Sequence, residues 1–121
     1  GVRAVPFESA LEDLDLDGAL DRVDRATLGH TRAVDHAMWV AQGHHGVLFV
    51  RKGSGEPFGY GYTSPAGRLG PVAILDPVLT SGALGALEAR HRALQARVEQ
   101  LVRDERERRD LAAKLPEQAQ I

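Results

Sequence analysis

The chain has 121 residues, of which 43% are hydrophobic and 26% charged, a balance typical of one globular domain with its own core. The formal net charge of −2 argues against a nucleic-acid partner, and the absence of cysteine excludes disulfides and thiolate metal sites. No apolar run is long enough to span a membrane, and the first residues do not resemble a secretory signal. We therefore expect a cytoplasmic protein with no membrane or nucleic-acid partner.

Charge is distributed unevenly along the chain. Residues 1–81 carry ten acidic and seven basic side chains, whereas the shorter segment 82–121 carries seven acidic and eight basic ones. The glycines stop at Gly85. This shift in composition predicts an α+β head over residues 1–81, followed by a long, charged, amphipathic helix over residues 82–121.

The head begins with a short strand and two helices. Residues 2–5 are suited to a strand that Pro6 ends. From Asp17 the spacing of apolar residues predicts an amphipathic helix that Gly29 ends. Its inner face is expected to hold Leu20, Val23 and Thr27.

The second helix is expected to begin after Thr31, which is a favourable N-cap residue, and to end before Gly43. Its apolar residues follow the helical spacing, so we expect them to face the core. They are Val34, Ala37, Met38 and Ala41.

Three strands of an antiparallel meander are predicted next. Apolar β-forming residues occupy 47–50, 58–63 and 68–75, and turn sequences rich in glycine, serine and proline separate them. The side chains expected to share one core are Leu48, Val50, Tyr60 or Tyr62, Val72 and Ile74.

Three aromatic residues alternate with glycines in the middle strand. The alternation predicts that Phe58, Tyr60 and Tyr62 share one face, while Gly59 and Gly61 leave the other face bare. Two interpretations follow. The bare face permits close approach of a helix or of another strand, or it forms a slot for a flat or extended ligand.

The last segment, from about Ser81 to Leu115, is predicted to be one helix. A set of mostly apolar residues in this helix recurs at alternating intervals of three and four, as in the seam of a coiled coil. This seam predicts a homodimer or a partner helix, and packing on the chain's own sheet is the alternative. The apolar seam residues are Leu84, Leu87, Leu94, Val98 and Leu101, with His91 among them.

The histidines do not form a recognisable catalytic or metal-binding pattern. His44 and His45 are adjacent without a nearby carboxylate, which favours a solvated loop pair over a metal site. Asp35 and His36 are also adjacent, but neighbouring residues on a helix do not face each other. We expect His36 at the surface or the edge of the core, and we assign neither a metal ligand nor a catalytic residue.

Two segments together resemble the GNAT family of N-acetyltransferases. Residues 58–77 read Phe-Gly-Tyr-Gly-Tyr, a turn, and Gly-Pro-Val-Ala-Ile-Leu-Asp-Pro, and residues 20–39 resemble the paired helices that precede the sheet in that family. The order of elements over residues 1–88 also resembles the first half of the GNAT fold. We therefore expect an α+β fold with two N-terminal helices, a three-stranded antiparallel meander and a long C-terminal amphipathic helix. The part that precedes the long helix resembles half of the GNAT fold, which in the family continues with further strands and a second helix.

The resemblance implies an acyl-CoA-dependent N-acetyltransferase with acetyl-CoA as its co-substrate. In the family, a central strand binds the pantetheine arm through its backbone, and the loop after that strand, together with the start of the following helix, holds the pyrophosphate. The residues at those places are Val72, Ala73, Ile74, Ser81, Gly82 and Gly85. Gly85 matches the family's phosphate signature, whereas Thr80 and Ala83 depart from it. The alternative function is a non-catalytic dimerisation or signalling module, built from the small head and the heptad helix.

Overall fold

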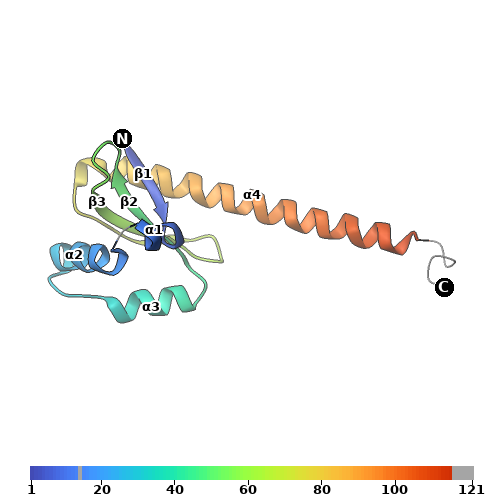
Figure 1. Ribbon diagram of the computed structural model, residues 1–121, viewed down its shortest axis with the longest axis horizontal. Helices are drawn as coiled ribbons and strands as arrows, with labels where there is room; N and C mark the ends of the chain where they lie inside the picture. The colour runs from blue at the N-terminus through green and yellow to red at the C-terminus, as the bar shows by residue number, and fades with distance from the viewer. Residues whose placement is uncertain (14, 116–121) are drawn as a thin grey trace. The chain divides into compact units, whose positions relative to one another are not determined.

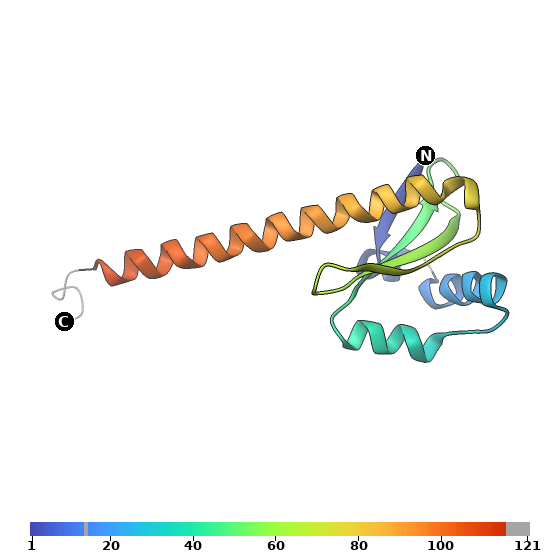
Figure 2. The same ribbon diagram turned by 180° about the vertical axis from the view of Figure 1, so that it is seen from behind.

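The computed structural model describes residues 1–13 and 15–115, which form an α+β protein (Figure 1, Figure 2). The chain divides into two compact units, residues 1–91 and 92–121, and the long helix α4, Thr80–Ala113, contributes to both. The first unit holds a four-stranded sheet in the order β1-β2-β3-β4, and each neighbouring pair is antiparallel. The strands are β1 Val2–Pro6, β2 His45–Arg51, β3 Pro57–Thr63 and β4 Leu69–Ile74.

The meander predicted between residues 47 and 75 is confirmed as β2, β3 and β4. The sheet has four strands rather than the three of the predicted meander, because β1, the short strand expected over residues 2–5, joins it. All five of its residues pair with β2, from Val2 opposite Arg51 to Pro6 opposite Val47. The sequence near Val2 indicated a strand, but its pairing partner lies more than 40 residues away and is decided by the fold.

Three helices, rather than the two predicted, separate β1 from β2. The additional helix has seven residues, too few for periodicity to reveal, and it packs through Phe7 and Ala10, which lie one turn apart. The next helix begins after Asp15, whose carboxylate accepts a hydrogen bond from the Gly18 amide at 3.0 Å. It ends at Gly29, which has a φ of 84°, as predicted. The helices are α1 Phe7–Asp13, α2 Leu16–Leu28 and α3 Ala33–Ala41.

Two predictions about α3 are wrong. Arg32 rather than Thr31 is its N-cap residue, and no side chain caps the helix. Its predicted inner face is exposed, with Val34 at 83% and Met38 at 46%, and both alanines of that face are exposed too. The one buried side chain of α3 is His36, because polar partners on α2 and β3 hold it, as described below.

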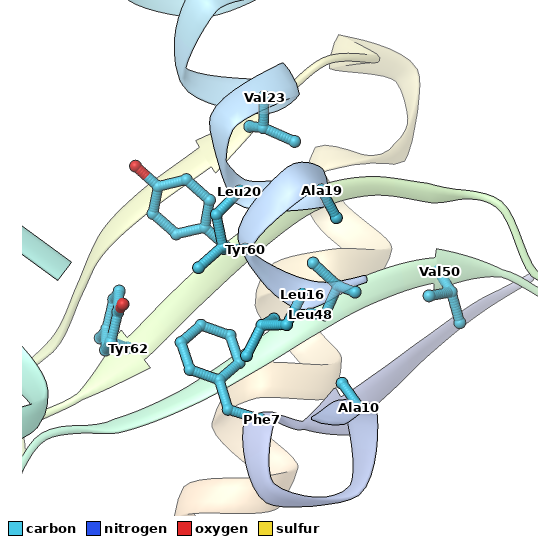
Figure 3. Close-up of a cluster of buried hydrophobic side chains, with 10 residues drawn as sticks. All are labelled: Phe7, Ala10, Leu16, Ala19, Leu20, Val23, Leu48, Val50, Tyr60 and Tyr62. Carbon is cyan, nitrogen blue, oxygen red and sulfur yellow. The ribbon is translucent and has the colours of Figure 1, made fainter. Parts of the chain in front are cut away.

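Each face of the sheet has its own core, so the prediction of a single core is also wrong. α1 and α2 cover one face, where Leu48 packs beside Tyr60 and Tyr62 (Figure 3). The register places Ala73 of β4 on this face, opposite Tyr60. Val72 and Ile74 therefore point to the other face, because side chains alternate along a strand. The buried core there consists of Val47, Phe49, Phe58, Ala83 and Leu87.

Phe58 does not share a face with the two tyrosines, contrary to the prediction. The pairing between β2 and β3 shifts register between Phe49 and Val50, and this irregularity turns Phe58 to the opposite side. There its ring stacks on that of Phe49, with centroids 6.2 Å apart. The alternation of Tyr60 and Tyr62 is confirmed, since both rings lie in the α1 and α2 core.

The glycines of β3 permit close packing, and the interpretation of a ligand slot is wrong. A Cβ atom added to Gly61 would lie 3.0 Å from Leu87 Cδ2 and 3.1 Å from Phe49 Cζ. One added to Gly59 would lie 2.5 Å from the carbonyl oxygen of Ala73. Leu87 of α4 and the neighbouring strands therefore occupy the space that these glycines leave.

Helix α4 spans Thr80–Ala113, so the prediction of one helix from about Ser81 to Leu115 is confirmed with slightly shorter bounds. A single turn of 3-10 helix, Pro77–Leu79, leads into it. Its buried side chains are Ala83 and Leu87, which cover the second face of the sheet. Leu87 thus contributes to the chain's own core, rather than to a seam with another helix. Leu84 is 40% exposed.

Candidate functional site

The six residues predicted to bind a coenzyme lie on β4 and on the first two turns of α4. Val72, Ala73 and Ile74 occupy the end of β4 and are partly buried. Ser81, Gly82 and Gly85 are exposed at the start of α4, and only a short loop and the 3-10 turn separate the two groups. The fold therefore places both groups at one corner of the first unit.

The outer edge of β4 offers unpaired backbone groups. β4 is the last strand of the sheet, and among the described residues no strand pairs with its other edge. The Leu75 amide donates to the Phe58 carbonyl at 2.8 Å, so Leu75 faces β3. Residues of an antiparallel strand alternate between facing the partner and facing away. The N–H and C=O groups of Val72 and Ile74 consequently point to the open edge.

The loop after β4 is held by Asp76. One of its carboxylate oxygens accepts a hydrogen bond from the Val78 amide at 3.1 Å, and the other pairs with Arg51 at 3.1 Å. The amide of Leu79 donates to the carbonyl of Asp76, and that of Thr80 donates to Pro77. The first amides of this helical segment are thus already bonded within the chain, and a carboxylate lies beside them.

The two helix glycines of the corner differ in the space around them. A Cβ atom added to Gly82 would lie 3.3 Å from Val2 Cγ2, so a side chain there disturbs the contact with β1. A Cβ atom added to Gly85 would have no neighbour within 4 Å. Gly85 is therefore the position at which a charge can be introduced without disturbing the packing.

A buried polar network, which the sequence reasoning missed, joins α2, α3 and β3. His36 Nε2 lies 2.7 Å from Asp24 Oδ2, and His36 Nδ1 lies 2.6 Å from the Tyr62 hydroxyl. The Tyr60 hydroxyl donates to the other carboxylate oxygen of Asp24 at 2.6 Å. Asp24 is fully buried and His36 is 7% exposed. A neutral His36 satisfies this network by donating from Nε2 to Asp24 and accepting at Nδ1 from Tyr62.

The partner of His36 is Asp24 and not its neighbour Asp35, whose carboxylate pairs with Arg32 at 3.0 Å. The expectation that His36 and Asp35 do not face each other is consistent with this arrangement. One signal in the sequence pointed to the network. Two tyrosines on one inward face require hydrogen-bond partners for their hydroxyl groups, although the pattern does not identify those partners.

Burial raises the pKa of both tyrosines above their usual value of 10. For Tyr60, the hydrogen bond to Asp24 acts in the same direction, because a phenolate beside a carboxylate is disfavoured. For Tyr62, the charges of Tyr60 and Asp24 add to the effect of burial. Both phenols are therefore neutral hydrogen-bond donors, and Figure 3 shows their hydroxyl groups on the side of the core opposite Val50.

A groove with a volume of about 1000 Å³ lies above this network. α2 contributes Asp17, Asp21 and Leu20 to its lining, and α3 contributes Ala37 and Val40. Asp24, His36 and Tyr62 form part of its lining as well. The groove thus combines apolar walls with several carboxylates.

The remaining histidines do not assemble into a site. His45 is exposed on β2, opposite Thr63, so the predicted loop pair is partly in a strand. His44 is half-buried, and its Nδ1 atom has no hydrogen-bond partner within the described part of the chain. Among residues 1–13 and 15–115, no group of three or more histidine or acidic side chains is placed to hold a metal ion.

Comparison with known proteins does not indicate a function for this chain, so the functional interpretation rests on the geometry of the structure. No family model, curated protein or solved structure matches this chain. In the described residues, no helix is both long enough and apolar enough to cross a membrane.

Proposed function

We propose that this chain is an acyl-CoA-binding domain of the N-acetyltransferase type. The observation that carries the proposal is the open edge of β4, which ends at the start of α4. Val72 and Ile74 present N–H and C=O groups there, and a pantetheine arm contains amides that can pair with such groups as an added strand does. The phosphates of the coenzyme would then lie near Ser81 and Gly85, where the helix dipole favours negative charge.

Asp76 opposes a coenzyme at this corner. Its carboxylate lies at the start of the helical segment, where it repels phosphate, although Arg51 pairs with it. Replacing it by asparagine keeps an oxygen for the Val78 amide and removes the negative charge. We therefore expect Asp76→Asn to bind acetyl-CoA several-fold more tightly than the parent protein.

Isothermal titration with acetyl-CoA tests the proposal. The parent should bind, and Gly85→Glu should weaken binding about tenfold, because it places a carboxylate near the phosphates without a packing clash. Ala96→Glu is the matched control, since it adds the same charge at an exposed position three turns further along α4. Absence of binding by the parent would overturn the proposal, and equal losses in the two variants would overturn this placement of the phosphates.

Acetyl transfer can be measured separately from binding. Transfer to an amine releases coenzyme A with a free thiol, and the chain contains no cysteine that would react with a thiol reagent. Thiol release that requires both acetyl-CoA and a primary amine would support an enzyme. Binding without release would support a binding domain.

A second candidate function, homodimerisation through α4, is favoured by exposed apolar residues in the second unit. Val98 is 59% exposed and Leu101 is 58% exposed, and together with the half-buried Leu94 they follow the heptad spacing. Burying such side chains against a second copy stabilises the pair by about 1.5–3 kcal/mol for each one fully covered. Leu87 does not take part, because it lies in the chain's own core.

Sedimentation equilibrium tests the dimer. The double variant Val98→Lys and Leu101→Lys changes two exposed seam positions, so it should leave the single chain folded and abolish association. Ala96→Lys with Gln100→Lys adds the same charge outside the seam and should remain a dimer. A parent protein that stays monomeric at high concentration would contradict this second function.

A further inference from the structure

Helix α3 is attached to the rest of the first unit by few side chains. Figure 1 shows it set apart from the sheet, with a connecting segment at each end. His36 is its one buried residue, and Trp39 is the residue of α3 that packs, partly buried, against the core. Val34, Met38 and Val40 are 83%, 46% and 54% exposed. Most of the apolar surface of α3 therefore does not hold it in place.

The attachment runs through the ring of His36. Its two nitrogens bond to different elements, Nε2 to Asp24 of α2 at 2.7 Å and Nδ1 to the Tyr62 hydroxyl of β3 at 2.6 Å. Its ring also packs edge-on against Tyr60, with centroids 4.7 Å apart. Trp39 adds contacts with Tyr62 at 5.1 Å between centroids. His36 thus joins α3 to both α2 and β3.

The segments flanking α3 are suited to a hinge. Gly29, which precedes it, has a φ of 84°, and Gly43, which follows it, has a φ of 85°. Glycine reaches such angles at little cost, and other backbone angles are equally open to it. A Cβ atom added to Gly29 would have no neighbour within 4 Å, so this residue is not packed against another part of the chain.

We propose that α3 is a hinged lid over the groove between α2 and α3, and that His36 is the latch that holds it closed. In the closed state, the carboxylate of Asp24 and the hydroxyl of Tyr62 are fully buried beneath the lid. Opening the lid breaks the two hydrogen bonds of His36. The Asp24 carboxylate and the Tyr62 hydroxyl then become accessible to solvent and to a ligand in the groove. Segments with few buried contacts open locally far more often than the whole domain unfolds. The inference does not depend on coenzyme binding at β4, which lies at a different corner.

A matched pair of tyrosine variants tests the latch. Tyr62→Phe removes the hydroxyl that bonds His36 and keeps the ring that Trp39 contacts. Tyr60→Phe removes the same atom from the same strand, but that hydroxyl bonds Asp24 rather than His36, and it also interacts with Arg32 at the start of α3. The comparison therefore separates the loss of the His36 bond from the general cost of removing a buried phenol hydroxyl.

Amide hydrogen exchange of the parent gives the first measurement. Amides 37–41 of α3 should exchange at least about a hundredfold faster than amides 47–50 of β2. Equal protection of the two segments would overturn the lid. This outcome needs no variant, so the proposal is tested even if a substitution impairs folding.

The variants then test the role of His36. Tyr62→Phe should accelerate exchange of amides 37–41 about tenfold more than Tyr60→Phe does, with amides 47–50 as the reference. Trp39 is the only tryptophan of the chain, so quenching of its fluorescence by acrylamide reports the same opening. Equal acceleration in the two variants, or quenching that does not follow exchange, would overturn the latch.

Discussion

Replacement of Asp24 by alanine should destabilise the first unit strongly. The Asp24 carboxylate is fully buried and accepts hydrogen bonds from His36 Nε2 and the Tyr60 hydroxyl, at 2.7 and 2.6 Å. Bonds to a charged acceptor contribute about 1.5–3 kcal/mol each, and their loss leaves two buried donors without partners. Removing the charge also recovers the cost of desolvating it, which offsets part of the loss. We expect a net loss of about 3 kcal/mol, a large part of the roughly 5–15 kcal/mol typical of a domain.

Urea unfolding measures this loss. Near-ultraviolet circular dichroism of Trp39, Tyr60 and Tyr62 reports on the first unit, because all three aromatic residues lie there. Asp21→Ala is the matched control on the same helix, since its exposed ion pair with Arg25 should contribute less than about 0.5 kcal/mol. If the two alanine variants differed by less than about 1 kcal/mol, the buried network would not support the fold, and the reasoning would be refuted.

Two further predictions concern the two cores. The pKa of Tyr60 and that of Tyr62 are raised by burial, so the folded chain keeps both phenols neutral while the unfolded chain ionises them above pH 10. Stability should therefore fall as the pH rises above 10, and phenolate absorbance should appear together with unfolding; ionisation near pH 10 without loss of structure would contradict this. Leu87→Ala should cost about 2–5 kcal/mol, because the side chain is fully buried over Gly61, whereas truncation of the exposed Leu111 should cost little in urea unfolding of the monomer. Equal effects of the two truncations would contradict the packing of α4 on the sheet.

Local sequence patterns predicted much of the secondary structure. Alternation and turn residues located β2, β3 and β4, and Gly29 marked the end of α2, because each of these signals acts within a few residues. The length of α4 also followed from its composition and from the absence of glycine after Gly85. These features depend on backbone preferences and on which residue types favour a helix or a strand.

Other features depend on partners that are distant in the sequence. The apolar spacing of α3 favoured Val34 as an inner residue, but the fold buries His36 instead, because Asp24 and Tyr62 supply both of its hydrogen bonds. Phe58 lies on the opposite face of the sheet from Tyr60 and Tyr62, because the register between β2 and β3 shifts beside it. A local sequence pattern does not predict such a shift, because the shift depends on the pairing of two strands. The buried polar network therefore had only a partial signal in the sequence.

The sequence alone determined the class of fold and the identity of most strands and helices, since local spacing and turn chemistry suffice for those. Only the tertiary structure decided which apolar stripes are covered, as Leu87 and Val98 show. Both residues occupy the same heptad seam, yet Leu87 is fully buried over Gly61 and Val98 is 59% exposed. The heptad repeat shows that a helix has an apolar side, and only the tertiary contacts of each residue decide whether it is covered.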